Sequence, residues 1–218
     1  MKLINSSYEI LTDIDGDKVL KDIENVARTC YKSHDHTKEG SAAKLVDTLI
    51  KSGHHAMLEF FDITVRFTCD RGVSHEIVRH RVASYAQEST RYCNYSKDKF
   101  GNELTFIEPY WLTEALLDDT DNARERLVFC LQHIEEIYMS LLNKGLQPQA
   151  ARAILPNCLK TELNVKMNLR EWRHFFNLRC SKAAHPDLRK LTLPLLAEFK
   201  AKLPIVFDDL YEKYCEEK

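Results

Sequence analysis

The sequence predicts an α+β fold, in which the helices and strands of residues 1–218 form a single domain. Two stretches, 61–68 and 159–168, alternate apolar with polar residues, as half-buried strands do. Longer stretches between and beyond them repeat apolar residues every three to four positions, which is typical of amphipathic helices. With 218 residues, 44% of them hydrophobic, the chain is long enough to bury one core.

Before the first of these strands the sequence predicts a further strand and two helices. Residues 2–11 alternate loosely and end at DIDGDK, which is typical of a turn, so a strand is expected there. Apolar residues at helical spacing predict a helix within 18–33. The stretch 41–53 predicts a second helix, capped at its start by Ser41 and ended by Gly53.

The middle of the chain is predicted to mix regular and irregular structure. After the strand at 61–68, Asp70 is a suitable N-cap for a helix over 71–81. Residues 82–102 are polar and rich in turn formers, which predicts a loop. The stretch 103–109 contains a short strand that ends at a proline.

Helices dominate the predicted C-terminal half. The most regular apolar spacing in the sequence runs through 121–144, and 147–155 predicts a shorter helix with a proline near its start. After the second alternating strand, 169–181 predicts another helix. Pro194 and Pro204 are expected to interrupt the helical region that closes the chain.

Composition argues against several classes of protein. The formal net charge is −2, so we expect no broad basic surface for nucleic acid or membranes. The seven cysteines are an odd number without a C-x-x-C pair, which favours reduced thiols in the cytoplasm over a disulfide framework or zinc knuckle. No stretch of 18 apolar residues occurs and no signal peptide is evident, so we expect a soluble, unprocessed protein.

Two simple catalytic interpretations are disfavoured. In HEIVRH, His75 and His80 are five residues apart and would point about 140° apart on a helix, so they do not form a zinc site. The adjacent His54 and His55 would diverge too, and a solvated turn is the alternative for them. Cys93 follows His80 in sequence, but nothing local marks its thiol as an activated nucleophile.

Arginine is concentrated in RGVSHEIVRHRVASYAQESTR, which contains four arginines and no lysine. Lysine would serve a solvated surface equally well, so the exclusive use of arginine indicates that the planar geometry of the guanidinium is needed. A helix would place Glu76, Arg79 and His80 on one face, with Ser89 and Arg91 following in a loop. Such a set can bind phosphate through paired, charge-assisted hydrogen bonds. A solvated helix face held by ion pairs is the alternative.

A second cluster lies in NLREWRHFFNLR. Arg170 and His174 are neighbours at i, i+4, and Arg179 lies near the far end of the predicted helix. Because the helix is partly apolar, its arginines need anionic partners, and the helix itself offers only Glu171. Arg152, in the apolar run AARAILP, raises the same question. A bound anion or an ion pair with a distant carboxylate would satisfy each arginine.

The motif RHR followed by seven residues and Ser resembles the signature of the flavin-dependent thymidylate synthases. GHHAMLEF, with His54 and Glu59, resembles that family's upstream segment, and QAARAILP and NLREWRHFFNLR resemble its two downstream arginine-bearing segments. The resemblance implies the thymidylate synthase complementing protein fold, with a small antiparallel-rich sheet, in a cytoplasmic homotetramer. It also implies a methyltransferase that binds FAD at subunit interfaces and converts dUMP to dTMP. 5,10-Methylenetetrahydrofolate would be the carbon donor and NADPH the reductant.

The resemblance also implies the site residues. The implied dUMP-binding residues are Glu76, Arg79, Gln87, Glu88, Ser89, Arg91, Arg152 and Arg179. The implied FAD-binding residues are His54, Ala56, Arg79, His80, Arg81, Gln87, Asn168, Arg170 and His174. Arg179 would be catalytic, because a cation beside the uracil ring favours its N3-deprotonated form. The family needs neither a metal nor a cysteine nucleophile.

Three positions depart from the family pattern. Glu76 stands where members often carry Gln, His174 where some carry Asn, and Ala56 where some carry a hydroxyl residue. A carboxylate repels phosphate, so Glu76 would bond to sugar hydroxyls or act through its backbone. A different class of function is a non-catalytic RNA- or nucleotide-binding module that uses the same arginines. The nearly balanced charge counts against that alternative.

Overall fold

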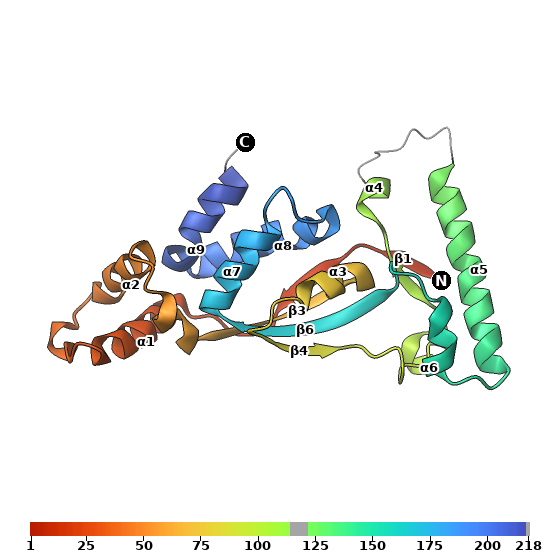
Figure 1. The fold of residues 1–218 in the computed structure, drawn as a ribbon, viewed down its shortest axis with the longest axis horizontal. Coiled ribbons are helices and arrows are strands. Elements are labelled where there is room, and N and C mark those ends of the chain that lie inside the picture. Colours follow the sequence, from red (N-terminus) through yellow and green to blue (C-terminus); the bar gives the residue numbers. More distant parts are fainter. Residues whose placement is uncertain (114–121, 217–218) are drawn as a thin grey trace. The chain divides into compact units, whose positions relative to one another are not determined.

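The computed structural model describes residues 1–113 and 122–216, and the chain divides into two compact units (Figure 1). Unit 1 consists of Met1–Ser7, Phe67–Arg79 and Ala86–Leu163. Unit 2 consists of Tyr8–Arg66, His80–Tyr85 and Asn164–Lys218. Among the helices of the described residues, none is both long and apolar enough to span a membrane.

A four-stranded sheet has the strand order β2-β3-β6-β4. Its strands are β2 (Ser7–Ile10), β3 (Asp62–Asp70), β6 (Lys160–Asn168) and β4 (Ser84–Gln87). The predicted alternation in β3 and β6 is confirmed, because every second side chain of each strand is buried. The two strands run antiparallel, with Leu169 N donating to Phe61 O at 3.0 Å.

Unit 1 has a small core of its own. Strand β1 (Lys2–Ile4) pairs in parallel with β5 (Thr105–Ile107). The helices of the unit are α3 (Arg71–Ile77), α4 (Tyr110–Thr113), α5 (Ala123–Asn143) and α6 (Pro148–Ala151), with 3-10 turns at Asp98–Phe100 and Arg152–Ile154. Leu131 and Tyr138 of α5 pack into the core with Phe106 and Leu159, so the helix predicted by apolar spacing is held along one face.

Unit 2 is mainly helical and is built around aromatic side chains. Its helices are α1 (Gly16–Thr29), α2 (Ser41–Lys51), α7 (Leu169–Arg179), α8 (Pro186–Lys202) and α9 (Pro204–Tyr211). Short helical turns lie at His34–His36, His55–Phe60 and Glu212–Glu216. Trp172 and Phe176 of α7 pack against Phe199 of α8 and Phe207 of α9 with ring centroids 5.2–5.8 Å apart. This aromatic cluster fixes α7, which carries most of the predicted flavin residues of the second arginine cluster.

Several predicted boundaries are wrong. The strand expected in 2–11 is divided into β1 and β2, which pair in different sheets. Residues 82–102 are not all loop, because 84–87 form β4, beside β6 in the sheet. Ser41 is not the cap of α2 but its first residue, and its hydroxyl contacts Glu24 Oε1 at 2.6 Å. The predicted start of the longest helix at Asp121 lies outside the described residues.

Helix α3 is shorter than predicted. Asp70 caps it as expected, accepting from Val73 N at 2.7 Å, but the helix ends at Ile77 instead of continuing to 81. Glu76, Arg79 and His80 therefore do not share one helix face. The chain leaves the helix before His80, which is 4% exposed.

Of the two prolines expected to interrupt the C-terminal helices, only one does so. Pro204 begins α9, whereas Pro194 lies inside α8. The missing N–H of Pro194 costs the helix one hydrogen bond. Leu191, Leu195 and Leu196 are buried on either side of it, so packing holds the helix together across the proline.

Candidate functional site

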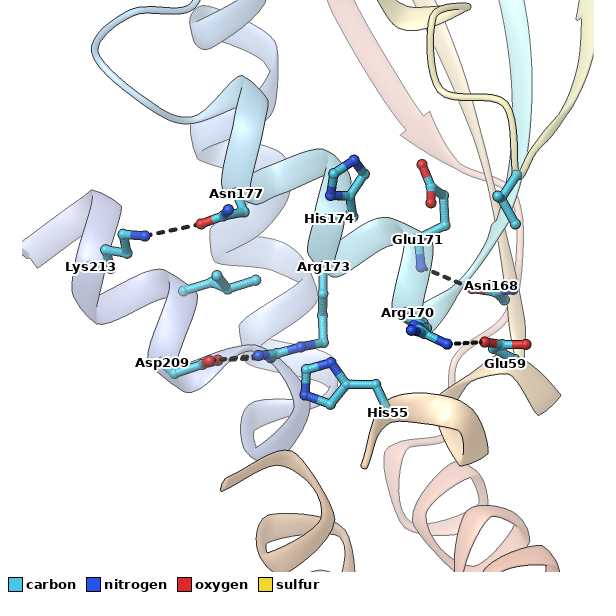
Figure 2. A pocket seen from close by; sticks show the side chains of 12 residues that line it. His55, Glu59, Asn168, Arg170, Glu171, Arg173, His174, Asn177, Asp209 and Lys213 are labelled. Atoms are coloured by element: carbon cyan, nitrogen blue, oxygen red, sulfur yellow. Dashed lines mark hydrogen bonds and ion pairs between the residues drawn. The ribbon is translucent and has the colours of Figure 1, made fainter. Parts of the chain in front are cut away.

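A cavity of about 820 Å³ opens in unit 2 beside the first two turns of α7 (Figure 2). This volume falls within the range of small-molecule and cofactor sites. The cavity is lined by His55, Glu59, Val82, Asn168, Arg170, Glu171, Arg173, His174, Asn177, Asp209, Leu210 and Lys213. Asn168 is fixed in place because its side chain caps α7 by accepting from Glu171 N at 2.9 Å.

The cavity gathers several cationic and neutral basic groups. Arg170 Nη1 donates to Glu59 Oε1 at 2.6 Å, and both side chains are about half exposed. The pKa of His55 is lowered by burial and by the charge of Arg173, which favours a neutral imidazole. His174 lies on the same face of α7 as Arg170, as Figure 2 shows. These groups can hold an anionic ligand without carrying a large uncompensated charge.

Arg173 is the most buried cation of the cavity. It makes two hydrogen bonds to the carboxylate of Asp209, at 2.8 and 2.6 Å, and a third to the backbone oxygen of Val206. Burial alone would raise the pKa of Asp209, but the hydrogen bonds and charge of Arg173 hold it below its usual value. Arg173 Nε is buried and has no hydrogen-bond partner within the described part of the chain. The bidentate pair thus anchors α9 to α7 at the cavity wall.

A buried polar chain lies beside the cavity in unit 2. His80 Nδ1 is 3.0 Å from Glu171 Oε1, and Arg179 Nε donates to His80 Nε2 at 3.1 Å. Tyr85 holds the backbone of His80, its hydroxyl donating to the His80 carbonyl at 2.5 Å. Burial lowers the pKa of His80, opposed by Glu171 and aided by the charge of Arg179. The imidazole is therefore neutral around pH 7.

His80, Glu171 and His174 also lie close enough to ligate a metal ion. One potential ligand atom from each lies within 4.8 Å of the others. Both ring nitrogens of His80 are already engaged, by Glu171 and Arg179, so a metal would have to displace one of these bonds. We therefore describe His80 and Glu171 as a hydrogen-bonded pair, with the ring of His174 packed against that of His80, and not as part of a metal centre.

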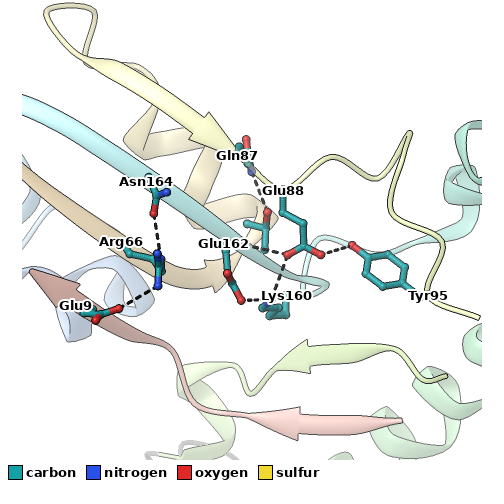
Figure 3. A network of polar contacts seen from close by, with 9 residues as sticks. Glu9, Arg66, Gln87, Glu88, Tyr95, Lys160, Glu162 and Asn164 are labelled. Carbon is teal, nitrogen blue, oxygen red and sulfur yellow. Dashed lines mark hydrogen bonds and ion pairs between the residues drawn. The ribbon is translucent and has the colours of Figure 1, made fainter. Parts of the chain in front are cut away.

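In unit 1, Glu88 lies at the centre of a polar network (Figure 3). Its carboxylate accepts from Tyr95 Oη at 2.7 Å, Lys160 Nζ at 3.1 Å and Glu162 N at 3.3 Å. Burial and Glu88 raise the pKa of Tyr95, so the phenol remains a donor. The side chain of Glu88 is thus committed to bonds within unit 1.

The residues next to Glu88 in the sequence differ in how many hydrogen bonds their side chains make within the protein. Gln87 Nε2 donates to Ser74 Oγ at 2.9 Å and Thr161 Oγ1 at 3.3 Å. Ser89 Oγ accepts from Arg91 N at 3.3 Å, whereas the guanidinium of Arg91 is exposed beside Tyr92. Gln87 therefore contributes to the packing of the unit, while the exposed Arg91 guanidinium can reach a ligand.

The remaining predicted nucleotide residues of unit 1 lie on α3 and beyond α6. Glu76 lies on α3 and Arg79 follows it, exposed. Arg152 follows α6 and its Nη1 donates to Thr90 Oγ1 at 3.3 Å. Thr90, only 6% exposed, was not predicted, although it stands between Ser89 and Arg91 in the motif. Of the set, only Arg179 belongs to unit 2.

The predicted flavin residues divide in a similar way. Asn168, Arg170 and His174 line the cavity of unit 2 together. His54 and Ala56 are exposed on either side of His55, which is the member of that segment that lines the cavity. Arg81 is exposed in unit 2, and Arg79 and Gln87 belong to unit 1.

Sequence reasoning missed several cavity residues. Arg173 stands three residues after Arg170 in the same motif and could have been found from that spacing. Its partner Asp209, with Leu210 and Lys213, comes from the C-terminal helices, where no motif marks a site. Neither Cys93 nor Cys180 is an activated nucleophile, because burial raises the pKa of the Cys93 thiol and raises that of the Cys180 thiol to about 12.

Comparisons with a family model and with individual proteins point to the same family. Residues 13–205 match the model of a family described as thymidylate synthase complementing protein. The flavin-dependent thymidylate synthase of Geobacter sulfurreducens is 32% identical over 190 residues, which cover 84% of this chain and 78% of that protein. The enzyme of the same name from Corynebacterium aurimucosum is 33% identical over 196 residues, 87% of this chain and 79% of that one.

A solved structure supports the same fold. The crystal structure of a UMP/dUMP methylase, PolB from Streptomyces cacaoi, bound with 5-Br dUMP, has a TM-score of 0.80 to this chain. It covers 98% of both chains at 19% sequence identity. The predicted α+β fold is therefore confirmed.

Proposed function

Because the chain belongs to the thymidylate synthase complementing protein family, we propose that it is a flavin-dependent thymidylate synthase that methylates dUMP to dTMP. One observation carries the proposal. The family match over 13–205 encloses every predicted site residue, from His54 to Arg179, and relatives with the enzyme's name align over most of the chain. Chemistry of this kind needs several cations, which a chain of net charge −2 supplies in local clusters.

The cavity of unit 2 fits a flavin dinucleotide. Its volume of about 820 Å³ suits a cofactor, and the guanidinium of Arg170 and the amide of Asn168 can bind pyrophosphate oxygens. His174 offers a further donor or acceptor on the same face. FAD, when bound, would supply the redox chemistry that reduction of the transferred carbon requires. NADPH as reductant and 5,10-methylenetetrahydrofolate as carbon donor complete the proposed reaction.

The chain's own residues would bind and polarise the nucleotide. Arg91 and Arg152, with the hydroxyl of Ser89, would hold the phosphate through charge-assisted bonds. Arg179 would contact the uracil ring and stabilise the negative charge that develops when N3 loses its proton. Glu76 would bond to the sugar hydroxyls, because its carboxylate would repel phosphate. The network of Glu88 and Gln87 would support the loop that carries these groups.

We also propose that residues 1–218 act as one enzyme domain, within a cytoplasmic homotetramer whose FAD sites lie at subunit interfaces. This part of the proposal rests on the family resemblance of the RHR motif and its companion segments. Neither nucleic acid nor a membrane is a proposed partner, in keeping with the nearly balanced charge of the chain.

The visible spectrum of the purified protein tests the function. We expect a yellow protein that bleaches with NADPH, recovers colour in air, and forms dTMP from dUMP when methylenetetrahydrofolate is added. Colourless protein that FAD cannot reconstitute would refute the proposal. A parallel titration with dUMP and a single-stranded RNA oligonucleotide separates the synthase from a binding module, which would prefer RNA and release it steeply with salt.

A further inference from the structure

The buried chain Glu171–His80–Arg179 leads from the interior of unit 2 to the proposed uracil-binding arginine. His80 is enclosed, with its ring edge-to-face against Phe175 at 4.9 Å between centroids and His174 at 5.6 Å. Glu171 is 9% exposed and fixed in the first turn of α7. Because the His80 ring is enclosed, its protonation and tautomer are set by the hydrogen bonds that its two nitrogens make.

The hydrogen bonds determine which nitrogen of His80 carries the proton. A guanidinium only donates, so His80 Nε2, 3.1 Å from Arg179 Nε, must present a lone pair. A neutral imidazole with an unprotonated Nε2 carries its proton on Nδ1. That proton faces Glu171 Oε1 at 3.0 Å, which accepts it. Glu171 therefore selects the tautomer that lets His80 accept from Arg179.

We propose that Glu171 is a positioning residue of the nucleotide site. Glu171 holds the Nδ1–H tautomer of His80, and His80 in turn fixes the plane of the Arg179 guanidinium through Nε. The backbone of Arg179 is held separately, by Thr192 Oγ1 donating to its carbonyl at 3.0 Å. The role proposed for Glu171 therefore concerns the orientation of the Arg179 side chain and not the position of its backbone. The proposal rests on the proposed function only for the role of Arg179 toward dUMP.

Two substitutions of nearly equal size isolate the hydrogen bond. Glu171→Gln keeps an oxygen that can accept from Nδ1–H, whereas Glu171→Met fills the same space without an acceptor. Glu24→Gln is the matched control, because Glu24 is another buried carboxylate of unit 2, 3% exposed and bonded to Arg28 instead of His80. Effects common to all three variants would report only the loss of a buried charge.

Histidine side-chain NMR tests the tautomer without substrate or activity. In protein labelled with nitrogen-15 histidine, the His80 signals, assigned with a His80→Gln variant, should show protonated Nδ1 and unprotonated Nε2. Glu171→Gln and Glu24→Gln should keep this pattern, and Glu171→Met should lose it. A protonated Nε2 in the unaltered protein, or an unchanged pattern in Glu171→Met, would overturn the inference.

Steady-state kinetics test the consequence for the nucleotide. We expect Glu171→Met to lower kcat/KM for dUMP about ten- to hundredfold, as loss of a partner that orients a functional imidazole does, while Glu171→Gln stays within about threefold of the unaltered enzyme. Equal losses in both variants would contradict a positioning role. If no variant and no unaltered protein forms dTMP, the proposed function fails, but the NMR spectra still decide the tautomer.

Discussion

The ion pair of Arg173 and Asp209 is expected to stabilise unit 2 only while the carboxyl group is charged. Replacing Asp209 with Asn keeps the size of the side chain and one acceptor oxygen but removes the charge. Replacing Arg173 with Met keeps much of the apolar stem but removes all three hydrogen bonds, including the bond to Val206 O. The pair of variants therefore separates the charge from the hydrogen bonds.

Burial sets the expected magnitudes. Breaking a fully buried ion pair costs about 3–5 kcal/mol, whereas an exposed pair is worth about 0–1 kcal/mol. The Arg173 side chain is 9% exposed but that of Asp209 is 52% exposed, so water can rehydrate the carboxylate. We expect Asp209→Asn to lower the free energy of unfolding by about 1 kcal/mol. Arg173→Met should cost about 2–3 kcal/mol, because the Val206 carbonyl also loses its donor.

The effect of pH has a definite sign. The pKa of Asp209 is lower in the folded protein than in the unfolded chain, where an aspartate titrates at about 3.9. The charged carboxylate therefore contributes its full stabilisation above that value and loses it as pH falls through the folded pKa. The difference in stability between the unaltered protein and Asp209→Asn should be complete above about pH 5 and shrink toward pH 3.

Urea unfolding followed by tryptophan fluorescence measures these differences. Trp172 adjoins Arg173, is fully buried and reports on unit 2, whereas Trp111 of α4 reports on unit 1. All variants should be compared at one protein concentration, since self-association would add to apparent stability. A difference between Asp209→Asn and the unaltered protein that stays constant or grows from pH 5 to pH 3 would refute this account of the pair.

Three further predictions concern single positions. Arg179→Ala should reduce dTMP formation by about a hundredfold or more, and Ser89→Ala by no more than about tenfold. The reason is that stabilising the charge on the reacting ring contributes more than one neutral hydrogen bond. Equal losses in the same assay would contradict the assigned roles. Glu88→Gln should lower the urea-derived stability of the protein by about 1–2 kcal/mol, because its carboxylate accepts three bonds within unit 1, and an unchanged midpoint would show that the network is dispensable. Gly16→Ala should lower the thermal midpoint, because a Cβ would collide with the backbone oxygen of Lys202, and a raised midpoint would mean that the helix end yields freely.

Elements set by local rules were predictable from the sequence. Asp70 and Asn168 each cap the helix that follows them, as short polar side chains before an amphipathic stretch do. Strands β3 and β6 followed from alternation alone, because one side of each is fully buried. These features depend on neighbours within a few residues, so one sequence contains the necessary information.

Elements set by distant partners were not predictable in the same way. Strand β4 has little alternation of its own and takes its place in the sheet beside β6. Helix α3 ends at Ile77, and His80 three residues later bonds to Glu171, a partner ninety-one residues away that no local pattern reveals. Pro194 breaks a local rule but is tolerated because its neighbours in α8 are buried. In each case a tertiary contact overrides the local preference.

The candidate site shows the same division. Arg170 and His174 could be paired from their i, i+4 spacing and Asn168 from its place at the helix cap, while the resemblance implied a common ligand for all three. Asp209 was missed because its carboxylate meets Arg173 only through the packing of α9 on α7. Motif spacing thus identifies site residues that lie on one helix. It does not identify the carboxylates that pair with them, such as Asp209, because those come from other helices.

Burial separates the arginines of the cavity into two kinds. Arg173 is enclosed and held in a bidentate pair, so removing Asp209 from it would leave a buried charge, and this arginine serves the structure. Arg170 bonds to Glu59 where both side chains are about half exposed, and such a pair contributes little to stability. A phosphate group would therefore displace Glu59 from Arg170 at small cost, while the Arg173–Asp209 pair holds the cavity wall in place. Each cavity arginine thus has a carboxylate partner that neutralises its charge and orients it in the absence of a ligand. Arg170 can exchange its partner for an anion, whereas Arg173 cannot.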